Sequence, residues 1–257
     1  MCIAAYQGER YIAVQLRSIL DQLCQDDEII VVDDGSTDET CDEISALQDA
    51  RVTLIRNIRN EGVLRAFETA LSRSTGEIVF LSDQDDVWLP NKVGTVLDAF
   101  ARDPDLMLVA SDAILIDEDG AEIGDSFYAQ RGQFRAGLWS NLLIGKFHGC
   151  TMAFRSALLQ KALPFPPGRL VHHDTYIGCM NALMRGETKY IAEPLVAYRR
   201  HATNATGRVK LSNYTRFKMR FQMLLGLLVS SHAKRWRGMR QARASATGDS
   251  GGKLISS

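Results

Sequence analysis

This chain of 257 residues lacks several features that would indicate a disulfide-rich, nucleic-acid-binding or membrane-spanning protein. Its five cysteines are odd in number and widely spaced with no C-x-x-C pair, so neither a disulfide framework nor a structural zinc site is predicted. The 30 Lys plus Arg nearly balance the 31 Asp plus Glu, so no overall field favours nucleic acid as a partner. No stretch approaches the roughly 20 apolar residues of a spanning helix, and no leader-like N-terminus occurs. We therefore expect a cytoplasmic protein.

A linker rich in Pro or Ser is also missing, so the main body of the chain gives no reason to divide it into independently folding units. With 46% hydrophobic residues it can bury one substantial core. We expect a single α/β domain over residues 1–207, with one half at 1–110 and another at 111–207.

Short β-branched runs alternate with segments of helical period in the first half, which is the pattern of βαβ units on a mainly parallel sheet. The expected strands are Cys2–Ala5, Glu28–Asp33, Val52–Arg56, Glu77–Ser82 and Leu106–Ala110. Between the first two, apolar residues at helical spacing predict a helix that packs on the sheet: Ile12, Leu16, Ile19, Leu20 and Leu23. Parallel strands place their carboxyl ends at one edge, where ligands bind.

Further helices are expected after Ser36 and over Glu61–Arg73, with Ser36 or Asp38 as the N-cap of the first. In the second half, the sequence predicts a helix near Asp174–Arg185 and two strands, around Lys189–Ile191 and Leu195–Tyr198.

The C-terminal part has a different composition. Between Arg208 and Arg243 every charged residue is basic, and apolar residues recur on one helical face: Tyr214, Phe217, Phe221, Leu224, Leu225 and Leu228. A basic amphipathic helix over 208–243 can lie on an anionic membrane surface, or it can be a terminal helix packed on the domain. The Gly- and Ser-rich residues 244–257 are expected to be disordered.

Three carboxylates follow a buried strand in Asp83-Gln84-Asp85-Asp86. Their mutual repulsion is unfavourable unless a cation neutralises them, and oxygen ligands favour Mg²⁺ or Mn²⁺ bridging to substrate phosphates. A solvated acidic turn that caps the helix after Pro90 is the alternative. A second acidic pair, Asp33-Asp34, ends another strand on the same edge and can present a carboxylate to a base or a ribose hydroxyl.

Taken together and in order, these motifs resemble glycosyltransferase family 2, inverting enzymes of the GT-A fold, and especially its bacterial rhamnosyltransferase-like branch. The matching stretches are Ala4–Glu9, Val31–Asp38, Asn60–Gly62, Phe80–Trp88, His173-Asp174 and Tyr198–His201 with Asn204. The resemblance covers about residues 1–207. It implies a GT-A domain with a nucleotide-sugar-binding half at 1–110 and an acceptor half at 111–207.

The resemblance assigns roles residue by residue. Residues implied to bind the donor are Ala5, Tyr6, Glu9, Asp34, Arg65, Asp83 and Arg199. Residues implied to bind Mg²⁺ or Mn²⁺ are Asp85, Asp83 and His201. Asp174 matches the catalytic base, which removes a proton from the acceptor hydroxyl as that oxygen attacks the anomeric carbon. A single displacement implies inversion.

The implied reaction moves a sugar, with rhamnose as the first expectation, from a dTDP- or UDP-linked donor to a saccharide or lipid-linked saccharide. Such a reaction belongs to bacterial surface polysaccharide synthesis at the inner face of the cell membrane. A nucleotide-sugar-binding relative with impaired catalysis and a sugar-nucleotidyltransferase are the alternatives. Two features depart from the family pattern: the first strand is short, which suggests either a misplaced start or a truncated chain, and Gln7 replaces the common Asn.

Overall fold

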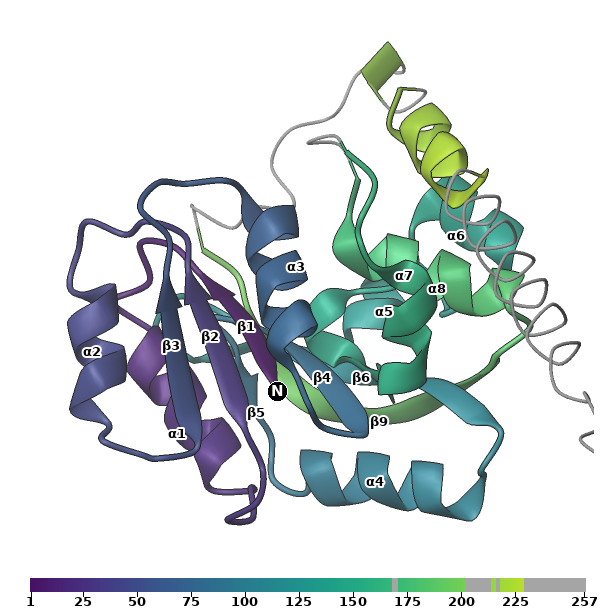
Figure 1. The fold of residues 1–257 in the computed structure, drawn as a ribbon. Helices are drawn as coiled ribbons and strands as arrows, with labels where there is room; N and C mark the ends of the chain where they lie inside the picture. The colour runs from purple at the N-terminus through teal and green to yellow at the C-terminus, as the bar shows by residue number, and fades with distance from the viewer. Residues whose placement is uncertain (168–170, 202–213, 216–217, 229–257) are drawn as a thin grey trace, which may run out of the picture.

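The computed structural model describes residues 1–167, 171–201, 214–215 and 218–228 (Figure 1). Within them, strands form one sheet in the order β3-β2-β1-β4-β8-β6-β9-β5, and β7 pairs with β6. The strands are β1 (Cys2–Ala5), β2 (Ile29–Asp33), β3 (Val52–Arg56), β4 (Ile78–Asp83), β5 (Val87–Trp88), β6 (Leu106–Ile116), β7 (Glu122–Gly124), β8 (Met152–Arg155) and β9 (Glu187–Arg199). The α-helices are α1 (Ile12–Leu20), α2 (Thr40–Ala46), α3 (Val63–Arg73), α4 (Lys92–Arg102), α5 (Phe127–Arg131), α6 (Leu138–Ile144), α7 (Leu159–Ala162) and α8 (His173–Leu183). Two short 3₁₀ helices are η1 (Gly149–Thr151) and η2 (Ser156–Leu158).

The first four strands in sheet order are parallel, as the βαβ pattern predicts. Ala5 pairs with Asp33, Asp33 pairs with Arg56, and Ala4 pairs with Asp83. These register positions place the carboxyl ends of β1, β2 and β4 at one edge. The acidic residues that follow β2 and β4 therefore lie on the same side of the sheet.

The second half of the sheet is mixed. Strand β8 runs antiparallel to both β4 and β6, β9 runs parallel to β6, and β5 runs antiparallel to β9. The prediction of two separate strands at 189–191 and 195–198 is wrong, because β9 is continuous. Its register shifts where Ile191 and Pro194 pair with the adjacent residues Ser111 and Asp112. Proline has no N–H to donate to a neighbouring strand, so the sequence around Pro194 predicts a break in the strand.

Two of the three hydrophobic clusters among the described residues lie on opposite faces of the sheet, because successive residues of a strand point to opposite faces. Cys2 and Val32 belong to the layer that includes residues of α3 and α8, whereas Ile3 and Val31 belong to the layer with residues of α1 and α4. Figure 1 shows α3 on one face of the parallel strands and α1 and α2 on the other. This sandwich confirms the predicted α/β architecture.

Two helix starts differ from the predictions. Helix α2 begins at Thr40 with Glu39 as its N-cap, so neither Ser36 nor Asp38 holds the cap position. The Asp38 carboxylate nevertheless accepts a hydrogen bond from the Thr40 amide at 3.2 Å. Helix α3 begins at Val63, because Gly62 has a φ of 95°, outside the helical range.

Residues 218–228 are helical and pack partly on the domain. Met223 and Leu227 are buried, whereas Phe221, Leu224, Leu225 and Leu228 of the predicted apolar face are exposed. The rest of the predicted 208–243 segment, apart from residues 214–215, and the predicted tail at 244–257 lie outside the described residues. Among the residues that are described, no helix combines the length and the apolar character needed to span a membrane.

Candidate functional site

The acidic turn Asp83-Gln84-Asp85-Asp86 lies at the carboxyl end of β4. Asp85 and Asp86 are buried, and Asp83 is partly buried. Burial raises the pKa of Asp83 well above its ordinary value, and the charges of Asp86, Asp85 and Asp174 raise it further. Burial, followed by the charge of Asp85, raises the pKa of Asp86 to about 7. A cation at this turn would relieve the repulsion between the carboxylates.

Lys92, the first residue of α4, supplies a buried positive charge beside the acidic turn. Only 1% of its surface is exposed, and its Nζ donates a hydrogen bond to the Cys150 carbonyl at 2.7 Å. The same Nζ lies 4.2 Å from the centre of the Trp88 ring. Burial lowers the pKa of Lys92 to about 8, against the opposing influence of Cys150, Asp86 and Asp83. Sequence reasoning missed this residue, because a lysine at the start of a helix ordinarily points to solvent.

His201 and Asp85, both implied metal ligands, lie in direct contact. The His201 Nε2 is 2.6 Å from the Asp85 Oδ2. Neighbouring ligand atoms of an octahedral ion with bonds of about 2.1 Å are about 3 Å apart. The two side chains would therefore need to separate by only a few tenths of an ångström to hold one Mg²⁺ or Mn²⁺, so the donor atoms present fit such an ion.

Arg199 lies beneath the acidic turn and is 6% exposed. Its guanidinium donates hydrogen bonds to the backbone carbonyls of Asp85, Asp117 and Glu118 at 2.8 to 3.2 Å, and its amide donates to the Asp86 carboxylate at 3.0 Å. These contacts hold the turn in place. All of these hydrogen bonds are within the protein, so they do not test the implied contact between Arg199 and the donor.

The residues implied to surround the nucleotide are linked by hydrogen bonds. The Asp34 amide donates to the Ala5 carbonyl at 2.8 Å, and the Asp34 carboxylate accepts from Asn57 and from the amides of Glu61 and Gly62. The Glu9 carboxylate accepts from the Glu39 amide at 3.0 Å. Asp34 therefore joins the end of β2 to the start of α3.

Tyr6 is half-exposed, and its backbone pairs with Gln84. The Tyr6 amide donates to the Gln84 Oε1 at 2.7 Å, and the Gln84 Nε2 donates to the Tyr6 carbonyl at 3.0 Å. This pair ties the loop after β1 to the acidic turn. Gln84 was missed by sequence reasoning because its partner is a backbone group 78 residues away.

Arg65 forms an ion pair with Glu68 within α3. The Glu68 carboxylate also accepts a hydrogen bond from the Phe165 amide at 2.8 Å. Arg65 is thus connected to α3, and through Glu68 to the loop after α7.

Asp174 lies in the first turn of α8 and is partly buried. Burial opposes its ionisation, but the charges of His173, His172 and His148 and the Thr175 amide together lower its pKa. The carboxylate is therefore ionised at neutral pH, as a proton acceptor must be. Asp174 also contributes to the raised pKa of Asp83, so the two carboxylates lie within electrostatic reach of one another.

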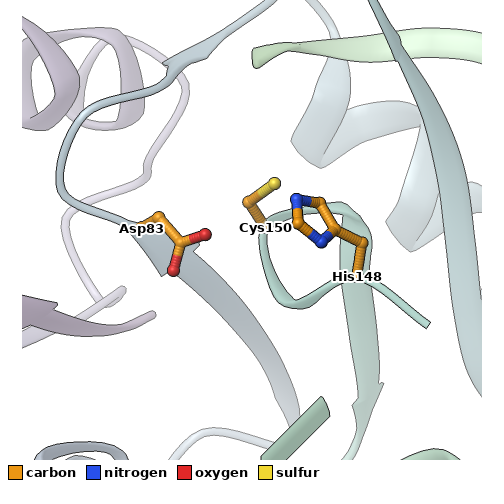
Figure 2. Close-up of side chains that lie close together, drawn as sticks. All are labelled: Asp83, His148 and Cys150. Carbon is orange, nitrogen blue, oxygen red and sulfur yellow. The ribbon is translucent and has the colours of Figure 1, made fainter. Parts of the chain in front are cut away.

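His148 and Cys150 face Asp83 from the other half of the sheet. Figure 2 shows the Asp83 carboxylate directed toward the Cys150 thiol and the His148 ring. One ligand atom from each of the three lies within 4.8 Å of the others. Sequence reasoning considered only widely spaced cysteines and missed His148-Gly149-Cys150, although His and Cys two residues apart can share a cation.

Comparison with known proteins identifies the family. The sequence model for glycosyl transferase family 2 matches residues 1–163. An uncharacterized glycosyltransferase of Nostoc sp. is 32% identical over 211 residues, which cover 79% of this chain and 64% of the relative. The Escherichia coli UDP-Glc:alpha-D-GlcNAc-diphosphoundecaprenol beta-1,3-glucosyltransferase WfaP is 36% identical over 91 residues, 35% of this chain and 36% of that protein. The chain thus spans less than two thirds of the length of either relative.

Solved structures with a similar fold come from a bacterium and an archaeon. Staphylococcus aureus TarS residues 1–349 in complex with UDP-GlcNAc has a TM-score of 0.70 at 15% identity, covering 88% of this chain and 65% of that one. The mannosyltransferase PcManGT of Pyrobaculum calidifontis in complex with GDP-Man and Mn²⁺ has a TM-score of 0.56 at 20% identity, covering 96% and 78%. These matches confirm the GT-A fold expected from the resemblance. Because the family model also covers more than half of the sequence, the chain belongs to glycosyl transferase family 2.

Proposed function

We propose that the protein transfers a sugar, with inversion, from a nucleoside diphosphate donor to a saccharide or lipid-linked saccharide. The observation that carries this proposal is the meeting of two acidic elements from different halves of the sheet. Asp83 is the last residue of β4, Asp174 lies in the first turn of α8, and the charge of Asp174 raises the pKa of Asp83. Asp83 can help to hold a metal ion against the departing diphosphate, while Asp174 can accept the proton of the incoming hydroxyl.

The chain's own residues divide the work. Asp34 and the loop after β1 position the nucleotide, and Asp85, Asp83 and His201 would hold Mg²⁺ or Mn²⁺ against its phosphates. Such an ion supplies charge stabilisation for the leaving diphosphate. Asp174, ionised at neutral pH, accepts the proton of the acceptor hydroxyl as that oxygen attacks the anomeric carbon. The presence of Mn²⁺ with GDP-Man in PcManGT supports the metal proposal.

A uridine nucleotide is the donor we propose first. WfaP is named for UDP-Glc, and the TarS structure contains UDP-GlcNAc. The expectation of a dTDP donor and of rhamnose rests on the family resemblance alone. The sugar is selected by hydroxyl contacts in the second half of the domain.

Donor binding is tested by calorimetric titration with UDP, dTDP and GDP, each with Mn²⁺ and with EDTA. We expect UDP to bind tightly only with Mn²⁺, and Asp85→Ala to lose that difference because the ion loses a carboxylate ligand. Asp98→Ala, which removes an exposed carboxylate of α4, is the matched control. Equal binding with and without Mn²⁺ would contradict the metal proposal.

The role of Asp174 is tested with Asp174→Asn, which keeps the shape of the side chain but removes the proton acceptor. We expect transfer to fall by roughly 10²–10⁴-fold while UDP binding is retained. The measurement is transfer from UDP-sugars to lipid-linked and free saccharides, with the anomeric configuration of the product read by NMR. Donor binding without transfer by the unaltered protein would favour the catalytically impaired relative.

Membrane association is proposed for the helical residues 218–228. Exposed Phe221, Leu224, Leu225 and Leu228 form an apolar face there, and WfaP is named for a diphosphoundecaprenol-linked acceptor. We expect the protein to float with anionic vesicles, and a Leu224→Ser, Leu225→Ser variant to float less, because apolar insertion is weakened. Vesicles of neutral lipid serve as the control. Absence of flotation with anionic vesicles would overturn this part.

A further inference from the structure

Asp83, His148 and Cys150 form a cluster that the transfer reaction does not use as a unit. Their ligand atoms lie within 4.8 Å of one another, and Figure 2 shows that the three side chains converge. We propose that this cluster is a second cation site, which takes a thiophilic divalent ion of the Zn²⁺ class and is separate from the Asp85–His201 pair.

The donor atoms favour this class of ion. A thiolate, an imidazole and a carboxylate are the ligands that Zn²⁺ uses, whereas Mg²⁺ and Mn²⁺ prefer oxygen. With Zn–S bonds of about 2.3 Å and Zn–N or Zn–O bonds of about 2.0 to 2.2 Å, tetrahedral ligand atoms are separated by roughly 3.5 Å. The observed cluster needs to contract by about an ångström. The side chain of Asp86 is close enough to Cys150 to interact with it, and it can supply a fourth ligand.

The two ligands from the second half of the sheet are held in place by buried contacts. The His148 ring stacks on Phe127 at a centroid distance of 4.6 Å and meets the Tyr198 ring edge-on at 4.7 Å. The His148 carbonyl accepts hydrogen bonds from the amide and the hydroxyl of Thr151. The Cys150 carbonyl accepts from Lys92. Ligands whose orientation is fixed in this way lose little freedom when an ion binds.

The site shares Asp83 with the proposed donor site. A Zn²⁺ ion bound to Asp83 would withdraw that carboxylate from Mn²⁺ and would lie beside Asp174, so Zn²⁺ is expected to inhibit transfer. This consequence rests on the proposed function, whereas the existence of the site does not.

The test uses Co²⁺ as a spectroscopic substitute for Zn²⁺ in the full chain. We expect Co²⁺ to produce the near-ultraviolet sulfur-to-cobalt charge-transfer band, and Zn²⁺ to remove it by displacement. Cys150→Ser should abolish the band, and His148→Gln should weaken Zn²⁺ binding at least tenfold in competition with a chromophoric chelator. Cys24→Ser, which alters an exposed cysteine, should keep the band.

Two results would overturn the site: no band in the folded unaltered protein, with folding checked by circular dichroism, or a band that persists in Cys150→Ser. Asp85→Ala separates the two proposals. It should retain the cobalt band and lose Mn²⁺-dependent UDP binding, so the failure of either proposal is visible without the other.

Discussion

At the scale of single residues, Gln84 and Gly8 depend on each other. A Cβ atom placed on Gly8 would lie 2.4 Å from the Gln84 Oε1 and 2.7 Å from its Cδ. The amide group of Gln84 occupies this space because it pairs with both backbone polar groups of Tyr6. Any side chain at position 8 would displace the amide and break the link between the loop after β1 and the acidic turn.

We therefore expect Gly8→Ala to lower the free energy of unfolding by about 1–2 kcal/mol, which corresponds to two hydrogen bonds, and to weaken UDP binding. Gly94→Ala is the control, since nothing lies within 4 Å of its added Cβ. That change, inside α4, should stabilise the protein by roughly 0.5–1 kcal/mol.

Urea unfolding of both variants, of Gln84→Ala and of the Gly8→Ala, Gln84→Ala double variant measures the coupling. In the double variant the loss should be smaller than the sum of the single losses. Additive losses would show that Gly8 is required for a reason other than Gln84.

The site residues differ in how far the sequence could predict them. Asp83, Asp85 and Asp174 follow from recognisable motifs, and the contact of Asp85 with His201 agrees with their implied shared role. Gln84 and Lys92 could not be predicted, because their contacts are with residues far away in the sequence. His148 was missed although it lies two residues before Cys150. Arg199 stays a predicted donor contact, and its burial against the acidic turn depends on how β9 pairs with β6.

At the scale of elements, the start of α8 contains a histidine whose surroundings favour the neutral imidazole over the protonated one. His173 is buried, its ring stacks on Phe67 at 3.9 Å, and its Nε2 has no hydrogen-bond partner within the described part of the chain. Burial lowers its pKa to about 4 from 6.5. The unfolded chain therefore binds a proton at this position more tightly than the folded protein.

Stability should thus fall as the pH decreases from 6.5 to about 4, by up to about 3 kcal/mol from this residue. Above pH 6.5 the ring is neutral in both states and contributes no pH dependence. We expect His173→Gln to lose less stability than the unaltered protein over this range, as measured by urea unfolding at several pH values. His172→Gln, at an exposed neighbouring position, is the control and should behave like the unaltered protein. A fall in stability of equal size in His173→Gln would assign the pH dependence to other groups.

The elements themselves were predicted most accurately where local pattern and packing agree. Strands β1 and β3 have the predicted bounds, and α1 contains most of the predicted apolar stripe. Strand β6 extends to Ile116, beyond the predicted end at Ala110, because its pairing with β9 continues there. Such long-range pairing leaves no local signal in the sequence.

At the scale of the whole molecule, the junction of β4 with β8 joins the two halves of the sheet. Asp83 comes from the parallel half, while His148, Cys150 and Asp174 come from the other. The predicted division at residue 110 falls inside strand β6, which continues from Leu106 to Ile116. The two predicted halves therefore share one sheet.

Lys92 has a consequence for the charge of the ion that we propose at this junction. Asp83, Asp85 and Asp86 carry three negative charges when ionised, and the buried ammonium group of Lys92 offsets one of them. Within the acidic turn itself two charges remain, which a divalent ion would balance. A monovalent ion such as K⁺ would leave the carboxylates repelling one another, and a trivalent lanthanide would leave an excess positive charge. We therefore expect a preference for ions of charge two to depend in part on a lysine that donates its hydrogen bond to a backbone carbonyl.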